Sequence, residues 1–107
     1  MATSTIPNPT AWTRTTPTNT DSSVWTGGTI SLLKCNGIVQ IKIDGATFAA
    51  VQSRTTFATV PEGYRPLTES YFKDESGNSM LVDASGNVKT NARAAGTVWG
   101  TGVWIAG

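Results

Sequence analysis

The stretch GTISLLKCNGIVQIKID (28–44) predicts a β-hairpin. Two runs rich in β-branched and aliphatic residues, 28–34 and 39–44, flank the dipeptide Asn36-Gly37. Asn-Gly readily adopts positive φ at two successive positions, as the type I′ turn of a tight hairpin requires. In the second run apolar residues alternate with polar ones, which indicates one buried face and one solvated face. The two sets are Val39, Ile41 and Ile43 against Gln40, Lys42 and Asp44.

The rest of the chain continues this β pattern, because no window shows the ten or so residues of 3.6-residue period that a helix needs. Tight turns are indicated by Asp-Glu-Ser-Gly (74–77) and Ala-Ser-Gly (84–86). Short strands at 8–12-residue spacing predict an all-β fold, a compact antiparallel β-sandwich or barrel. Further strands are expected at 46–52, 55–60, 67–73, 78–83, 87–91 and roughly 97–105.

The first 27 residues differ from the rest, because they are rich in Thr, Ser, Pro and Asn and poor in aliphatic residues. We expect 1–27 to be a short extended N-terminal arm or linker and 28–107 to be one head domain. A head of about 80 residues obtains only about 3–5 kcal/mol from its own core. Oligomerisation or a partner surface is therefore expected.

Composition argues against several classes of function. The 107 residues carry a net charge of +1, and the 8 basic residues are scattered singly, so nucleic-acid binding is not expected. No apolar run reaches the roughly 18 residues of a membrane span. The N-terminus shows no signal-peptide pattern. The single cysteine, Cys35, leaves no internal disulfide and indicates synthesis in a reducing cytoplasm.

The sequence shows no catalytic signature. It has no histidine, which excludes Ser-His-Asp and Cys-His arrangements and histidine-ligated zinc. Asp74, Glu75 and Asp83 are the acids from which a glycosidase-type pair or a calcium site would be built. Acids in such turns are more often simply solvated. We therefore expect neither an enzyme nor a bound metal or other cofactor.

The segment PEGYRP (61–66) holds an aromatic residue beside a guanidinium group between two stiff prolines. Exposed, Tyr64 and Arg65 would stack on a sugar or grip a phosphate. The alternative, which we favour, is that Tyr64 packs over the edge of the sandwich and that Arg65 covers it.

The terminal run TVWGTGVWIAG (97–107) is apolar on both faces of its expected strand. Alternation places Trp99, Val103 and Ile105 on one face and Val98 and Trp104 on the other. A strand that is apolar on both sides must be covered on both sides, and a second subunit is the favoured cover. The rival hypothesis is a sugar-stacking platform on Trp99 or Trp104, with Gly100 and Gly102 leaving a ligand room to approach.

Taken together, these segments resemble a known family. Trp25 and a glycine pair lead into TISLLKCNGIVQIKIDG (29–45), and TVPEGYRP (59–66), ESGNSMLVDASGNVKTN (75–91) and a Gly/Trp-rich strand follow. This pattern resembles the C-terminal head domain of tail-fibre and receptor-binding proteins from phages of Gram-positive bacteria, over roughly residues 25–105. The resemblance implies a β-sandwich head that assembles as a homotrimer and binds a bacterial surface saccharide near subunit interfaces. It also implies other tail or baseplate proteins as partners and a location in the virion tail.

The leading hypothesis is therefore a non-catalytic receptor-binding head of a phage or prophage tail. One alternative is a structural virion or tail-decoration protein whose terminal strand docks on a neighbour, and another is a carbohydrate-active enzyme that uses the turn acids. Candidate ligand-binding residues are Tyr64, Arg65, Tyr71, Trp99 and Trp104, with Asp74 and Asp83 as hydroxyl acceptors. Candidate interface residues are Trp12, Val98, Val103, Trp104 and Ile105.

Overall fold

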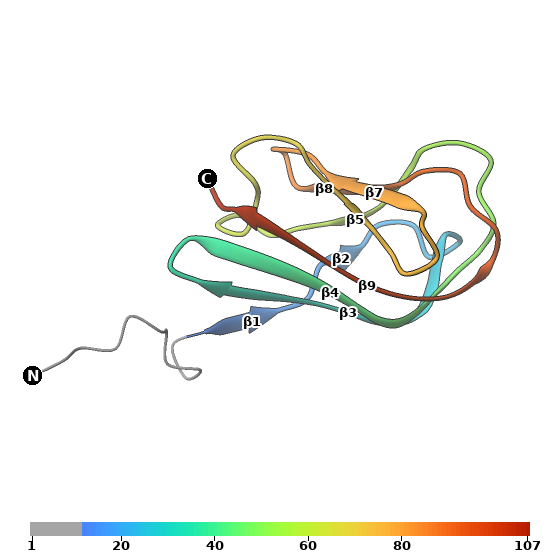
Figure 1. Cartoon of the computed structure of the whole chain (residues 1–107), viewed down its shortest axis with the longest axis horizontal. Coiled ribbons are helices and arrows are strands. Elements are labelled where there is room, and N and C mark those ends of the chain that lie inside the picture. The colour runs from blue at the N-terminus through green and yellow to red at the C-terminus, as the bar shows by residue number, and fades with distance from the viewer. Residues whose placement is uncertain (1–11) are drawn as a thin grey trace, which may run out of the picture.

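Two antiparallel β-sheets pack face to face in the computed structural model, which describes residues 12–107 (Figure 1). The first sheet has the strand order β1-β3-β4-β9 and the second β2-β5-β8-β7-β6. This confirms the predicted all-β sandwich. Within the described residues no helix is long and apolar enough to cross a membrane. The strands are β1 (Thr13–Thr15), β2 (Thr18–Asn19), β3 (Trp25–Cys35), β4 (Ile38–Phe48), β5 (Thr55–Thr59), β6 (Ser70–Lys73), β7 (Ser79–Val82), β8 (Asn87–Thr90) and β9 (Gly96–Ile105).

The hairpin of β3 and β4 forms as the Asn-Gly signal predicts. Asn36 and Gly37 have φ values of 51° and 76°, so both turn positions are left-handed. Alternate residues of β4 are buried from Val39 to Ile43, and the residues between them face outward. The local pattern of this segment therefore describes its structure correctly.

β4 does not end at Gly45, where a strand break was predicted. It continues to Phe48, and a β-bulge between Asp44 and Ala46 absorbs the glycine, whose φ is 69°. Gly28, with φ 78°, lies across from it on β3, and a Cβ atom there would stand only 2.1 Å from the Gly45 carbonyl oxygen. The separate strand predicted at 46–52 is therefore wrong. The two glycines let long strands bend where their backbones come closest.

The described part of the predicted N-terminal arm belongs to the sandwich. β1 pairs with β3, and β2 pairs with β5, so this segment crosses from the first sheet to the second. Val24 and Trp25 are buried in the core. The boundary predicted after residue 27 thus falls inside β3. A Thr-rich segment completes two sheets here because it supplies backbone hydrogen bonds at their edges rather than apolar side chains.

The core lies between the sheets and contains side chains of both. Phe57 of β5 is fully buried, and Phe48 of β4 meets its ring edge-on at a centroid distance of 5.0 Å. The loop before β6 meets the end of β9, where the Leu67 amide donates to the Ile105 carbonyl. The turn after β6 comes down onto β9 (Figure 1), where Asp74 bridges to Gly100. This contact joins the two sheets and positions the surface described next.

Candidate ligand-binding surface

β9 shows the predicted alternation, and the structure decides which of its two faces is covered. Trp99, Val103 and Ile105 point outward and are exposed, whereas Val98 and Trp104 point into the core. Trp104 is 4% exposed, and its Nε1 donates a 2.7 Å hydrogen bond to the carbonyl of Tyr64. The second sheet of the same chain therefore covers the face of Val98 and Trp104, and the face of Trp99, Val103 and Ile105 is the one left uncovered. Val98 and Trp104 are core residues, which corrects their assignment to an interface and that of Trp104 to a ligand site.

Gly100 and Gly102 turn their Cβ side toward the second sheet and not toward a ligand beside Trp104, although Gly100 also lines a surface hollow at Trp99. A Cβ atom on Gly102 would lie 2.7 Å from the ring of Phe72, and one on Gly100 would lie 2.9 Å from the Cα atom of Asp74. Both positions are small because β6 and the turn after it press against the inner side of β9. The glycines therefore allow the two sheets to approach each other.

Asp74 is buried and forms an ion pair within the protein. One oxygen, Oδ1, accepts hydrogen bonds from the amides of Ser76 and Asn78, and Oδ2 lies 2.9 Å from Nη1 of Arg93. The Arg93 guanidinium also lies over the ring of Phe48, 4.8 Å from its centroid. Asp74 is therefore not available as an acceptor for ligand hydroxyls, which corrects its prediction. No local pattern pointed to its partner, which comes from the loop after β8.

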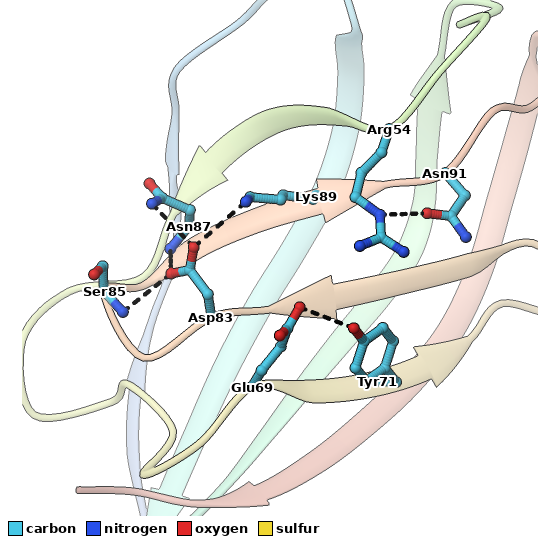
Figure 2. A network of polar contacts seen from close by, with 8 residues as sticks. All are labelled: Arg54, Glu69, Tyr71, Asp83, Ser85, Asn87, Lys89 and Asn91. Atoms are coloured by element: carbon cyan, nitrogen blue, oxygen red, sulfur yellow. Dashed lines mark hydrogen bonds and ion pairs between the residues drawn. The ribbon is translucent and has the colours of Figure 1, made fainter.

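Asp83 occupies the same position in a second turn of the same design (Figure 2). Its Oδ1 accepts hydrogen bonds from the amides of Ser85 and Asn87, and its Oδ2 lies 3.6 Å from Nζ of Lys89. Desolvation raises the pKa of Asp83, but the hydrogen bonds from Asn87 and Ser85 and the attraction of Lys89 outweigh it and lower the pKa below 3.8. This carboxylate remains partly accessible, although its turn uses much of its hydrogen-bonding capacity.

Tyr64 packs where the favoured interpretation placed it, but the cation over its ring is Lys34, and Arg65 lies against Gly86. Tyr64 is half-buried against the core, and its hydroxyl donates to Oγ1 of Thr13 at 2.8 Å. Nε of Arg65 donates to the carbonyl of Val60 at 3.0 Å. The pair thus ties the loop after β5 to the sheets. Trp12, another predicted interface residue, is half-buried just before β1.

Trp99 lies at a surface hollow of about 310 Å³, and its side chain is 47% exposed. Gly45 lies beside the indole, since a Cβ atom on this glycine would make an ordinary van der Waals contact of 3.8 Å with Nε1 of Trp99. We call this depression the Trp99 hollow and define it by the side chains of Lys42, Lys73, Glu75, Trp99 and Thr101.

Three strands contribute to the Trp99 hollow, and their register sets its order. Lys42 of β4 faces Thr101 of β9, and the antiparallel bridge between Asp74 and Gly100 brings Lys73 to the other side of Thr101. The Glu75 amide donates to the Trp99 carbonyl at 2.9 Å, which places Glu75 beside the indole. Of these side chains, the sequence indicated Trp99 as a ligand contact and Glu75 only as an acid for catalysis or calcium binding.

Tyr71 is exposed on the outer face of the second sheet, away from the Trp99 hollow's indole. Its hydroxyl donates to Oε1 of Glu69 at 3.0 Å, and the Arg54 guanidinium lies 5.9 Å from its ring centroid. Arg54 is held by Oδ1 of Asn91, which its Nε reaches at 2.8 Å (Figure 2). Of the ligand candidates, Tyr71 and Trp99 are exposed, and Tyr64, Arg65 and Asp83 are half-buried. Tyr71 and Asp83 share this second face (Figure 2).

One end of the β4–β9 surface is apolar. Ile38 pairs with Ile105 across the strands, and Val103 and Leu67 lie close to this pair. The four side chains are between 45% and 64% exposed. We call Ile38, Leu67, Val103 and Ile105 the apolar strip. Sequence alternation identified Val103 and Ile105, but Ile38 was missed because it lies in a turn-flanking position, and Leu67 because its loop meets β9 only in the fold.

No protein-family model and no curated protein matches this chain, so similarity to known proteins does not indicate its function. Among residues 12–107, no group of three or more acidic or cysteine side chains is arranged to hold a metal ion. The surfaces that bear on function are the Trp99 hollow, the outer face of the second sheet around Tyr71, and the apolar strip.

Proposed function

We propose that the protein is a non-catalytic, saccharide-binding head of a phage or prophage tail that recognises the bacterial surface as a homotrimer. The observation that carries the proposal is the half-exposed indole of Trp99 at the wall of a hollow with charged and hydroxyl side chains. The tail location and the bacterial host come from the resemblance of the sequence to phage receptor-binding heads.

The Trp99 hollow suits a sugar because a sugar ring has an apolar C–H face and a rim of hydroxyls. An indole offers a large, rigid apolar surface for the face, and Glu75, Thr101 and the lysines offer hydrogen-bond partners for the rim. The volume of about 310 Å³ lies at the lower end of the range for small-molecule sites. It suits a short saccharide better than a large cofactor.

The turn acids support binding rather than hydrolysis. A glycosidase needs one carboxyl group to donate a proton and another to attack or activate water. Asp74 is buried against Arg93, and Asp83 lies in the separate turn after β7 with Lys89. Asp74 and Asp83 are each engaged by their own turn, so Glu75 has no free turn carboxylate to pair with, which argues against the enzyme hypothesis.

The apolar strip supports the assembly part of the proposal. Apolar side chains gathered on one solvent-facing region favour contact with another protein surface, and a second copy brings the same strip. Three linked sites would strengthen weak saccharide binding by avidity. The strip equally favours the second candidate, a tail-decoration protein without a ligand of its own, so the binding experiment must separate the two.

Binding to cell-envelope polysaccharides from a panel of Gram-positive bacteria tests the saccharide function. We expect the intact chain to be retained on at least one fraction, Trp99→Ala to abolish retention, and Tyr71→Ala to preserve it. Loss with Tyr71→Ala and not with Trp99→Ala would move the site to the second sheet. No retention on any fraction would refute saccharide binding and favour the decoration protein.

Light scattering at micromolar concentration tests the trimer separately. We expect the mass of three chains, and we expect Ile105→Lys to yield monomers because it places a charge in the apolar strip. Thr97→Lys is the matched control, since Thr97 is exposed on the same side of β9 at its other end. A monomeric wild-type protein would refute the trimer.

A further inference from the structure

We infer that the Trp99 hollow binds a sugar that carries an anionic oxygen group, either a carboxylate or a phosphate. This inference rests on the saccharide-binding function proposed above and specifies its ligand.

Among residues 12–107, the side chains of Lys42 and Lys73 lack the hydrogen-bond or ion-pair partners that most other basic side chains have. In the described chain, Lys34, Arg54, Arg65, Lys89 and Arg93 each donate a hydrogen bond or form an ion pair. The side chains of Lys42, Lys73 and Arg14 make neither with any described residue. Two of these three cations line one hollow.

Lys42 and Lys73 flank the same residue, Thr101. Lys42 faces Thr101 from β4, and Lys73 stands beside it from β6, as the bridge between Asp74 and Gly100 requires. Neighbouring strands are about 4.8 Å apart, so the two lysine backbones lie about 10 Å apart across Thr101. Their long flexible stems let both ammonium groups meet one anion above the Thr101 hydroxyl.

The carboxylates of Asp44 and Glu75 belong to residues that lie two positions further along the strands, next to Trp99 instead of Thr101. Asp44 faces Trp99 from β4, and Glu75 stands beside Trp99 on the other side. The surface therefore has a Trp99 row, in which Asp44 and Glu75 are the neighbours of Trp99 and Glu75 lines the hollow, and a Thr101 row, in which Lys42 and Lys73 are the neighbours of Thr101. Carboxylates accept hydrogen bonds from sugar hydroxyls and repel an anion, whereas lysines attract it.

The distance between the Trp99 row and the Thr101 row matches the size of one sugar ring with an exocyclic group. Trp99 and Thr101 point the same way and are two residues apart, which is about 7 Å along a strand. A ring stacked on Trp99 places its hydroxyls toward Asp44 and Glu75, and its exocyclic group reaches the Thr101 row. An anionic group at that point is held by two charge-assisted hydrogen bonds.

The test uses the intact chain on an array of neutral bacterial glycans together with glycans that bear a uronic acid or a phosphate. We expect the retained glycans to be anionic, and the two anionic arms show whether carboxylate or phosphate is preferred. In titrations of a retained glycan, Lys42→Gln and Lys73→Gln should each weaken binding about fivefold to tenfold. Arg14→Gln is the matched control, because it removes an exposed positive charge from β1 and should change the affinity less than about twofold.

The outcomes separate the inference from the proposed function. Retention of neutral glycans that depends on Trp99 but not on the lysines overturns the inference and leaves saccharide binding in place. No retention of any glycan overturns both. Inorganic phosphate that competes equally well in wild type and in Trp99→Ala would reduce the hollow to a simple anion site and overturn the sugar part. Unchanged thermal unfolding of the lysine variants shows that weakened binding is not loss of fold.

Discussion

Asp74→Asn should destabilise the protein far more than Asp83→Asn, although the two residues occupy equivalent turns. Asp74 Oδ1 accepts amide hydrogen bonds of 2.9 and 3.0 Å, and Asp83 Oδ1 accepts two of 3.0 and 2.9 Å. An asparagine oxygen can accept the same bonds, so the cost within either turn is small. The variants differ in what happens to the partner of the second carboxylate oxygen.

The magnitude follows from the burial of the two ion pairs. Asp74 and Arg93 lie 2.9 Å apart with side chains 0% and 2% exposed, whereas Asp83 and Lys89 lie 3.6 Å apart with side chains 25% and 32% exposed. Removing one partner of a buried pair costs about 3–5 kcal/mol, because the remaining charge has no counter-ion. An exposed pair contributes about 0–1 kcal/mol. The variants should therefore differ by about 3 kcal/mol.

Urea unfolding at pH 7, followed by tryptophan fluorescence, measures this difference. With an m-value of about 1.5 kcal/mol/M, Asp74→Asn should lower the unfolding midpoint by about 2 M and leave the m-value unchanged. The measurement is repeated at several protein concentrations, because assembly stabilises the folded chain by mass action.

A double variant checks the reason for the effect. Asp74→Asn with Arg93→Met removes the buried charge that the single variant leaves behind, so it should recover part of the lost stability. Equal effects of Asp74→Asn and Asp83→Asn, or a double variant less stable than Asp74→Asn alone, would refute the reasoning.

Other consequences concern one backbone contact, one core residue and one titration. Gly28→Ala should prevent stable folding, because its Cβ atom would lie 2.1 Å from the Gly45 carbonyl oxygen. Gly37→Ala, with open space at φ 76°, should cost about 1 kcal/mol. Similar unfolding midpoints of the two variants would contradict this. Trp104→Ala should cost about 3–5 kcal/mol in unfolding experiments even for a monomer, since the indole is core; a loss of assembly at unchanged stability would restore its interface role. The folded-state pKa of Asp83 is lowered, so its stabilisation is present above about pH 4 and is lost as pH falls through that folded pKa. The gap in free energy of unfolding between wild type and Asp83→Asn should therefore shrink from about pH 5 to pH 2, and a constant gap would count against the hydrogen bonds of Asn87 as its cause.

The surface proposed to bind ligand was only partly predictable. Trp99 was a candidate because it is aromatic and lies in an uncharged strand, and the structure leaves it accessible. Lys42 was identified only as a solvated residue of its strand, and Lys73 was not singled out. They belong to one hollow because β4, β9 and β6 are neighbours in space, and nothing near either lysine in the sequence encodes that contact.

The sequence by itself determined the features that depend on a few adjacent residues. These are the left-handed turn at Asn36-Gly37, the alternation along β4 and β9, and the turns that begin at Asp74 and near Asp83. Each follows from local backbone preference or from the two-residue period of a strand, so no distant contact is needed to specify it.

Only the tertiary structure decided which faces are covered and which side chains meet. It placed Trp104 inside and Trp99 outside on the same apolar strand, and it buried Asp74 with Arg93 while its counterpart Asp83 stayed accessible. Local sequence cannot distinguish members of such pairs, because burial depends on the sheet that packs above each residue. That packing brings together strands far apart in the chain, and it also assembles the row of Lys42, Thr101 and Lys73 beside Trp99.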